Sequence, residues 1–173
     1  MTTTEIANAA GLSDEAMPLV RDDDNPQQCA EKLADKGMFA DAIKLIAHAS
    51  EPVPVIAWGR DCVKQLPPPE PAPSPDQSLA AVEAWLENQE EDRRQAARAA
   101  AEKSGNSKPS DLLALAVFFT GSIGEPDAPP AEPPPYLMNK MVAGCVQLSA
   151  VGFTPEKNAE RFRTAIRLAS KGK

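Results

Sequence analysis

Apolar residues recur three and four positions apart through most of the chain, which is the spacing of one face of an α-helix. No stretch of strand length alternates apolar and polar residues, so the pattern contains no β candidate. We therefore expect an all-α protein, a single-domain bundle of seven or eight helices. The predicted helices cover residues 26–36, 38–50, 55–66, 75–87, 89–104, 110–121, 136–151 and the stretch from 155 towards the end of the chain.

Several of these helices carry a terminal signal. Asn25 supplies an N-cap side chain before Pro26, and Gly37 ends the helix. Ser74 and Asn88 each stand three residues before a Gln or Glu, as in a capping box. The side chains expected to face the interior follow the helical spacing: Cys29, Ala30, Leu33, Phe39, Ala42, Ile43, Ile46, Ala49, Val55, Trp58, Cys62, Leu66, Leu79, Val82, Trp85, Leu86, Leu137, Met141, Gly144, Cys145, Leu148, Phe162, Ala165, Ile166 and Ala169.

The domain organisation follows from composition. Residues 1–24 show no sustained period and end in an acidic run, so we expect a loosely ordered acidic leader before a helical domain of residues 25–173. Two connections in that domain, 67–75 and 126–135, contain six prolines each. Prolines at this density favour polyproline II, which rises about 3.1 Å per residue. Each connection then spans about 30 Å and returns the chain along the bundle, so that its two flanking helices run parallel.

A second interpretation of the prolines is recognition by another protein. The segment "PPAEPP" in the second connection has the P-x-x-P spacing of ligands for proline-binding domains. Such ligands usually carry an adjacent Arg or Lys, whereas only acidic residues flank this one. The sequence therefore favours the rigid extended connection over the recognition motif.

Charge is unevenly distributed along the chain. The net charge of −7 disfavours nucleic acid as a partner, because phosphate contacts need a basic surface. Residues 1–24 nevertheless carry −5 and residues 155–173 carry +4. Either these two ends are solvated surfaces that attract each other weakly, or the basic last helix docks on a partner protein with an acidic surface. The candidate partner-binding residues of this helix are Arg161, Arg163, Arg167 and Lys171.

The compartment can be inferred from what the sequence carries at its start and in its core. The segment "MTTTEIANAAGLSDEAM" has neither the basic nor the long apolar region of a secretion signal. The longest wholly apolar run, residues 112–119, is eight residues long, against about 20 for a membrane-spanning helix. We expect a cytoplasmic protein without membrane insertion, in which Cys29, Cys62 and Cys145 are buried free thiols.

Candidate chemistry is sparse. Phosphate loops, H-E-x-x-H, G-x-S-x-G and cysteine-pair zinc motifs do not occur in the sequence, and we predict no catalytic, cofactor-binding or metal-binding residue. The one histidine, His48, is expected on the polar side of its helix. The turn "TGSIGE" at 120–125 could bind an anion through free backbone N–H groups, with Thr120 and Ser122 as candidate residues. A turn that simply ends a helix explains the same residues.

Two resemblances add context. Residues 26–50, with "G-x-F-x-x-A-I" from Gly37, resemble one helical hairpin of a tetratricopeptide repeat, but no repeat follows. From Trp58 onward, the segments "AVEAWLENQEEDRRQAARAAAE", "LLALAVFFTGSIGEP" and "MVAGCVQLSA", with the two proline blocks, resemble an uncharacterised bacterial family of small helical proteins. That resemblance implies genes often located near type VI secretion genes in proteobacteria, and no known activity.

Taken together, these features predict a non-catalytic cytoplasmic adaptor or chaperone-like protein-binding module, serving a type VI (contractile) secretion system as an accessory. The alternative is a small enzyme or anion-binding protein that uses the turn at 120–125. No cofactor is predicted for the adaptor.

Overall fold

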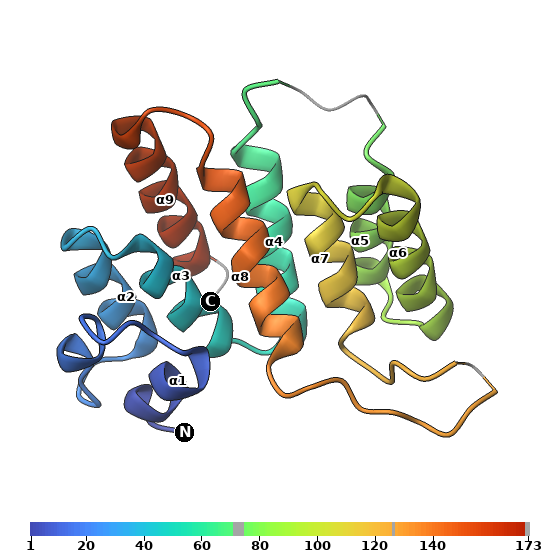
Figure 1. Cartoon of the computed structure of the whole chain (residues 1–173), viewed down its shortest axis with the longest axis horizontal. Coiled ribbons are helices and arrows are strands. Elements are labelled where there is room, and N and C mark those ends of the chain that lie inside the picture. Colours follow the sequence, from blue (N-terminus) through green and yellow to red (C-terminus); the bar gives the residue numbers. More distant parts are fainter. Residues whose placement is uncertain (71–74, 126, 172–173) are drawn as a thin grey trace.

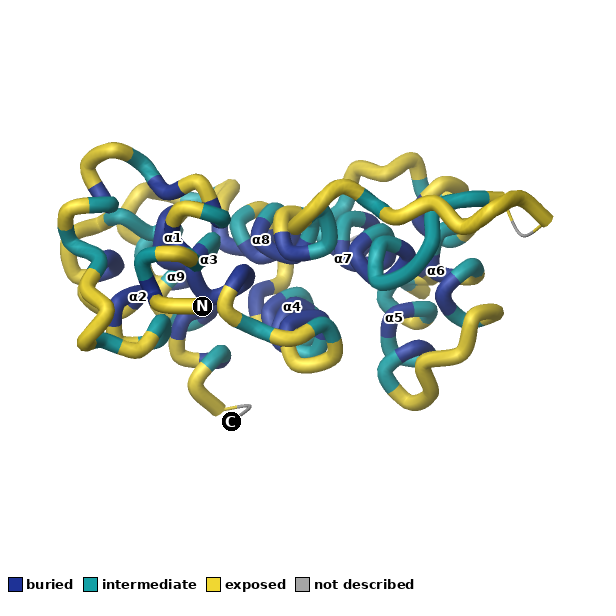
Figure 2. The backbone as a smooth tube through the Cα atoms, turned by 90° about the horizontal axis from the view of Figure 1, so that it is seen from below, coloured by how far each residue is buried: buried dark blue, intermediate teal, exposed yellow. Residues whose placement is uncertain are grey.

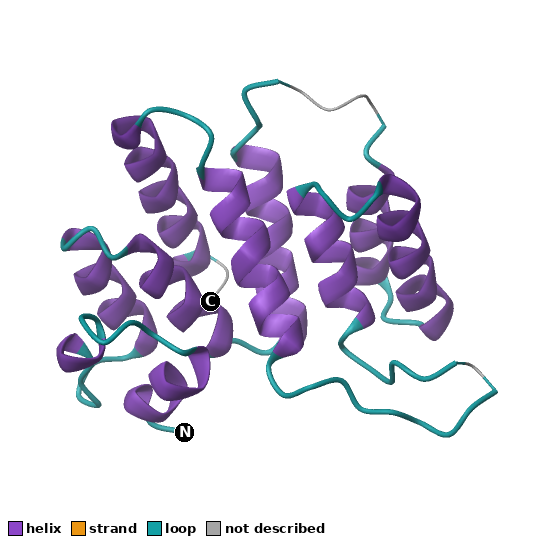
Figure 3. Ribbon diagram, in the orientation of Figure 1, coloured by secondary structure: helices purple, strands orange, loops and turns teal. Residues whose placement is uncertain are grey.

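The computed structural model describes residues 1–70, 75–125 and 127–171. These residues form nine α-helices and one 3-10 helix and contain no strand (Figure 3), which confirms the all-α prediction. Among them, no helix combines the length and apolarity that crossing a bilayer requires. The helices are α1 (Thr3–Ala10), η1 (Met17–Leu19), α2 (Pro26–Asp35), α3 (Phe39–His48), α4 (Pro52–Gln65), α5 (Gln77–Glu87), α6 (Glu91–Ser104), α7 (Pro109–Phe118), α8 (Leu137–Ala150) and α9 (Pro155–Ser170).

The helices α4 and α8 lie side by side at the centre of the molecule (Figure 1). On one side α3 and α9 pack against them, with α1 and α2 further out, and on the other side lie α7, α5 and α6. Seen from below, buried residues line the surfaces where helices face one another, and exposed residues follow the connections (Figure 2). One continuous core therefore joins the two sides through α4 and α8.

The helix ends follow local side-chain chemistry. Asn25 and Gln28 form the predicted capping box, with the Asn25 side chain accepting from the Gln28 N–H at 2.9 Å. Asp76 caps α5 by accepting from the Leu79 N–H at 3.0 Å, whereas the predicted cap, Ser74, lies outside the described residues. The chain breaks near Asn88 as expected, but Glu90 is the N-cap residue of α6.

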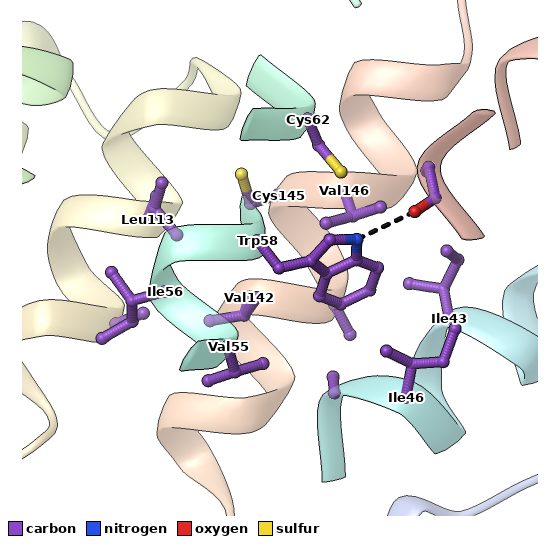
Figure 4. Close-up of a cluster of buried hydrophobic side chains, with 14 of the residues drawn as sticks. Ile43, Ile46, Val55, Ile56, Trp58, Cys62, Leu113, Val142, Cys145 and Val146 are labelled. Carbon is purple, nitrogen blue, oxygen red and sulfur yellow. Dashed lines mark hydrogen bonds between the residues drawn. The ribbon is translucent and has the colours of Figure 1, made fainter. Parts of the chain in front are cut away.

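Trp58 on α4 occupies the middle of the core (Figure 4). Its ring lies among apolar side chains of α3 and α8, and its Nε1–H donates to the Ala165 carbonyl of α9 at 2.9 Å. The next residue, Gly59, brings α4 close to α7, because a Cβ at this position would lie 2.6 Å from Leu113 Cδ1. A missing side chain at Gly59 thus makes room for the fully buried Leu113.

The prediction of a loosely ordered leader is wrong. Thr2 and Glu5 form a capping box for α1, and Ala7, Ala10, Leu12 and Ala16 are buried in the core. Both oxygens of the Asp41 carboxylate accept hydrogen bonds from Ser13, one from its N–H at 2.9 Å and one from its hydroxyl at 2.8 Å. The acidic run is also used structurally, since the Asp22 carboxylate accepts from the Thr4 N–H of α1 at 2.8 Å and the Asp24 carboxylate pairs with Lys32 Nζ at 2.7 Å.

The prediction that the proline-rich connections return the chain along the bundle is also wrong. The end of α4 and the start of α5 lie at one end of the molecule, and the end of α7 and the start of α8 lie at the other (Figure 1). Each connection therefore joins antiparallel helices. The ends to be joined already lie near each other, so neither connection is needed to span the length of a helix.

Some side chains expected in the core lie elsewhere. Leu148 is 47 % exposed near the end of α8, Ala49 is exposed, and Phe39 is only half-buried where its ring stacks on Phe162 at 5.2 Å. A further seven predicted interior positions are half-buried: Leu79, Leu86, Leu137, Met141, Gly144, Phe162 and Ala169. The remaining predicted interior positions are buried, and the three cysteines are buried and free as predicted.

Candidate functional site

A cavity of about 510 Å³ opens where α4 and α8 end and α5 and α7 begin. We call it the α4–α8 groove. Its apolar edge includes Leu148 and Val151, which are 47 % and 39 % exposed. Exposed apolar side chains of this size beside a cavity are characteristic of surfaces that bind other molecules. The residues that line the groove are Val63, Leu66, Pro67, Pro68, Pro69, Glu70, Asp76, Leu79, Ser107, Lys108, Pro109, Ser110, Leu148, Ser149 and Val151.

One wall of the groove is fixed by Arg161 of α9. Its Nη2 donates to the Pro67 carbonyl at 2.7 Å and to the Ser149 carbonyl at 2.8 Å, and its guanidinium carbon lies 4.2 Å from the centre of the Phe153 ring. Pro67 begins the proline-rich connection, and Ser149 lies in the last turn of α8, where the helix dipole favours a cation. Burial lowers the pKa of the Arg161 guanidinium. Arg161 thus fastens the connection to α8.

The opposite wall depends on Asp111, a fully buried carboxylate in the first turn of α7. It accepts hydrogen bonds from the Ser78 and Ser104 hydroxyls at 2.7 and 3.0 Å and from the backbone N–H groups of Ser107 and Lys108 at 3.0 Å. Burial alone would raise the pKa of Asp111, but these four hydrogen bonds outweigh burial and lower it. One ionised side chain thereby ties α5 and the end of α6 to the start of α7.

The chemistry of the groove is that of an apolar binding surface with a charged rim. Lys108 Nζ lies 3.5 Å from Asp76 Oδ1 and 4.0 Å from Asp111 Oδ1, so the cation of the rim is paired. The Ser110 hydroxyl beside the groove is buried and has no hydrogen-bond partner among the described residues. In the described part of the chain, no group of three or more His, Cys, Asp or Glu residues could hold a metal ion.

The candidate residues of the last helix separate into two sets. Arg163 and Arg167 are exposed on α9, and Lys171 is exposed directly after its last residue. The guanidinium of Arg163 lies over the Phe39 ring at 5.1 Å. Arg161 is only 8 % exposed, so its predicted place on a docking surface is wrong. Its backbone acceptors come from distant parts of the chain, and no pattern in the sequence could have identified them. The four residues do not form one surface.

The candidate residues of the turn at 120–125 are engaged within the protein. The Thr120 hydroxyl donates to the Val117 carbonyl at 2.7 Å, and the Ser122 hydroxyl oxygen accepts from the Gly124 and Ala131 N–H groups. Beneath the turn lies the buried Arg94, whose Nη2 donates to the Ser122 carbonyl at 2.8 Å. The turn therefore closes over a structural arginine, and its two candidate side chains already have partners.

Two further titratable groups, on α6 and α3, have shifted pKa values. Hydrogen bonds from Arg94 and Gln95 lower the pKa of Glu91 to about 2, so Arg94 stays paired with a carboxylate. His48 is buried, and its expected place on an exposed polar face is wrong. Its Nδ1 lies 2.8 Å from the Lys44 carbonyl, its Nε2 has no partner among the described residues, and burial lowers its pKa.

The architecture defines an all-α protein with an apolar groove at the ends of α4 and α8. Residues 29–171 match DUF6931, a family of unknown function, and the chain belongs to this family. The match covers α2 to α9 almost completely and confirms the expected kinship with an uncharacterised family. Neither the curated proteins nor the solved structures contain a match to the chain.

Proposed function

We propose that the chain is a non-catalytic adaptor or chaperone-like module that binds another protein through the α4–α8 groove. The observation that supports this proposal is the presence of two partly solvent-exposed apolar side chains, Leu148 and Val151, at the edge of an apolar cavity. Leaving such side chains in water gains nothing for folding, whereas covering them with a partner contributes about 25 cal/mol for each Å² of apolar surface buried. The cavity volume suits a few apolar side chains of a partner.

The groups around the groove favour binding over chemistry. The Asp111 carboxylate is saturated by four hydrogen bonds, and Lys108 is paired with carboxylates, so neither is poised to transfer a proton. The alternative function, an enzyme or anion-binding protein that uses the turn at 120–125, has no observation in its favour. Thr120 and Ser122 are both engaged by their own neighbours.

The proposal also concerns which kind of protein the partner is. The exposed cations Arg163, Arg167 and Lys171 favour a partner with an acidic surface. Their positive charge would attract such a surface at separations up to about the Debye length, beyond which salt screens the interaction. The resemblance found in the sequence suggests that this partner belongs to a type VI secretion system, with the chain acting in the cytoplasm as an accessory. The groove would then supply affinity and the basic face of α9 would supply orientation.

The test is a comparison of two charge insertions of the same kind. Leu148→Asp places a carboxylate on the edge of the groove, and Val53→Asp places one at a similarly exposed position at the far end of α4. Tagged proteins are purified from the native host at native expression, and the partners enriched by the wild type are quantified. We expect Leu148→Asp to reduce recovery of those partners at least tenfold, because an apolar anchor is worth about 1.5–3 kcal/mol. Val53→Asp should leave recovery unchanged, and equal recovery with both variants would refute the proposal.

A further inference from the structure

The connection between α7 and α8 is much longer than the fold requires. The helix α7 ends at Phe118 and α8 begins at Leu137, so the connection comprises residues 119–136, which are 18 residues. The two helices are antiparallel neighbours (Figure 1), and Gly144 of α8 faces Leu112 of α7. About two to eight residues usually join such helices. The chain instead runs away from the body and back again (Figure 1). Extra length of this kind in a compact protein is usually functional.

The far part of this connection is exposed and chemically uniform. We call residues 127–135 the proline loop. Eight of its nine residues are exposed, and Figure 2 shows it projecting from the body. It contains Pro129, Pro130 and Pro133–Pro135, which restrict the backbone before any partner arrives. Its charged residues are Asp127 and Glu132, and the sequence has no Lys or Arg between Thr120 and Asn139.

The loop is held where it leaves the body. The Ile123 N–H donates to the Ala131 carbonyl at 2.8 Å, and the Ala131 N–H donates to the Ser122 hydroxyl oxygen at 3.0 Å. A Cβ on Gly124 would lie 2.9 Å from the Pro129 carbonyl oxygen, so the two arms of the loop also touch here. These contacts reduce the entropy that a partner must remove on binding.

The loop is also held where it rejoins the body. Tyr136 adopts a left-handed backbone with φ +61°, accepts the first hydrogen bond of α8 from the Lys140 N–H, and places its ring 5.5 Å from that of His48. A left-handed conformation is unfavourable for a non-glycine residue, so the packing of this junction has to hold it. The loop is therefore presented in a fixed position rather than tethered loosely.

We propose that the proline loop is a second partner-binding element, which docks in an aromatic-lined groove with a basic rim on another protein. Exposed, pre-extended proline segments are recognised by grooves of this kind, because prolines stack on aromatic rings at low entropic cost. The loop supplies only negative charge, so the complementary cations must come from the partner. The α4–α8 groove lies where α4 and α8 end. The proline loop leads instead into the start of α8, at the other end of that helix (Figure 1), so this proposal does not depend on the one above.

The first experiment asks whether the loop has a structural role. Residues 127–133 are replaced by the dipeptide Gly-Ser, which shortens the loop by five residues. Helical content and the thermal midpoint are then measured by circular dichroism. Because the helix ends already lie together, we expect unchanged helical content and a midpoint within about 3 °C of the wild type. A drop of more than about 3 °C, or a loss of helix, would show that the length serves folding and would overturn the proposal.

The second experiment tests the chemistry of the partner. Purified SH3, WW and EVH1 domains serve as probes, because their aromatic-lined grooves bind proline segments. The full chain should bind the probes with basic rims. The shortened loop and the double variant Asp127→Asn with Glu132→Gln should each weaken that binding at least tenfold. The double variant Asp14→Asn with Glu15→Gln is the control, because it neutralises two exposed carboxylates outside the loop, and it should bind as the wild type does. Failure of every probe to bind at about 1 mM, or equal binding by the shortened loop, would overturn the proposal.

Discussion

Replacing Asp111 with Asn tests whether the buried carboxylate holds α5, α6 and α7 together. The change keeps the shape of the side chain and removes its charge. Oδ2 accepts three hydrogen bonds, from the Ser104 hydroxyl and the N–H groups of Ser107 and Lys108, and Oδ1 accepts one from the Ser78 hydroxyl. In Asp111→Asn the amide oxygen can keep the three donors, and the amide nitrogen can donate to Ser78.

The expected loss of stability follows from the charge of the acceptor. Hydrogen bonds to a charged group contribute about 1.5–3 kcal/mol each, against about 0.5–1.5 kcal/mol for neutral pairs. Weakening three of these hydrogen bonds costs about 3 kcal/mol of stability. The amide introduced by Asp111→Asn carries no charge, so the cost of burying a charge is removed and offsets part of this loss. We therefore expect Asp111→Asn to lower the free energy of unfolding by about 2 kcal/mol, and the thermal midpoint by about 4–8 °C.

The assay is urea unfolding followed by circular dichroism, with the adjacent Ser110→Ala as control. Ser110 is buried on the same helix, but its hydroxyl has no partner among the described residues, so its removal should leave stability unchanged or slightly raised. The pKa of Asp111 is lowered in the folded protein, so its contribution is complete above the ordinary value of 3.8 and is lost as pH falls through the folded value. The difference between wild type and Asp111→Asn should shrink below pH 3.8. Equal stability of the two proteins at pH 7 would refute the reasoning.

Three further predictions concern other parts of the fold. Arg161→Met removes the donor to the Pro67 carbonyl and should lower the free energy of unfolding by about 2 kcal/mol in urea titrations. A change below about 0.5 kcal/mol would contradict the role of Arg161 in fastening the connection to α8. Gly59→Val places methyl groups against the buried Leu113 and should lower the unfolding midpoint in urea, at a cost of about 1–3 kcal/mol, so an unchanged midpoint would argue against close packing. His48, the one histidine, should titrate below pH 6.5 in NMR spectra. The free energy of unfolding should fall as pH drops from 6.5 through the folded pKa, because the unfolded chain binds the proton more readily. A titration midpoint at or above pH 6.5 would exclude an uncharged buried ring.

The helices and most of their inner faces could be predicted from sequence because both depend on local spacing. Asn25 is an example, since its cap involves only the residues that follow it. The helix α1 was missed although Thr2 and Glu5 carry its capping signal, because its buried face consists of alanines and Thr3 and gives little periodicity. The misplacement of Leu148 has another cause. The helical period places it on a buried face, but the described structure leaves an open groove beside that face.

The candidate site was harder to predict because it depends on contacts between distant segments. Arg161 looks like a surface residue by type, and only the folded chain brings the Pro67 and Ser149 carbonyls to it. The proline-rich connections were assigned the wrong role for the same reason. Local geometry gives the reach of a proline segment, but only the tertiary fold shows that the helices it joins already meet at one end (Figure 1).

The burial of all three cysteines has a practical consequence. Each thiol is enclosed by the core, and burial raises the pKa of Cys29, Cys62 and Cys145, so the reactive thiolate form is scarce at neutral pH. The native chain should therefore be almost inert to maleimides while folded. One cysteine introduced in the proline loop would become the sole labelling position, and a fluorophore or cross-linker could be attached there without first removing the natural thiols.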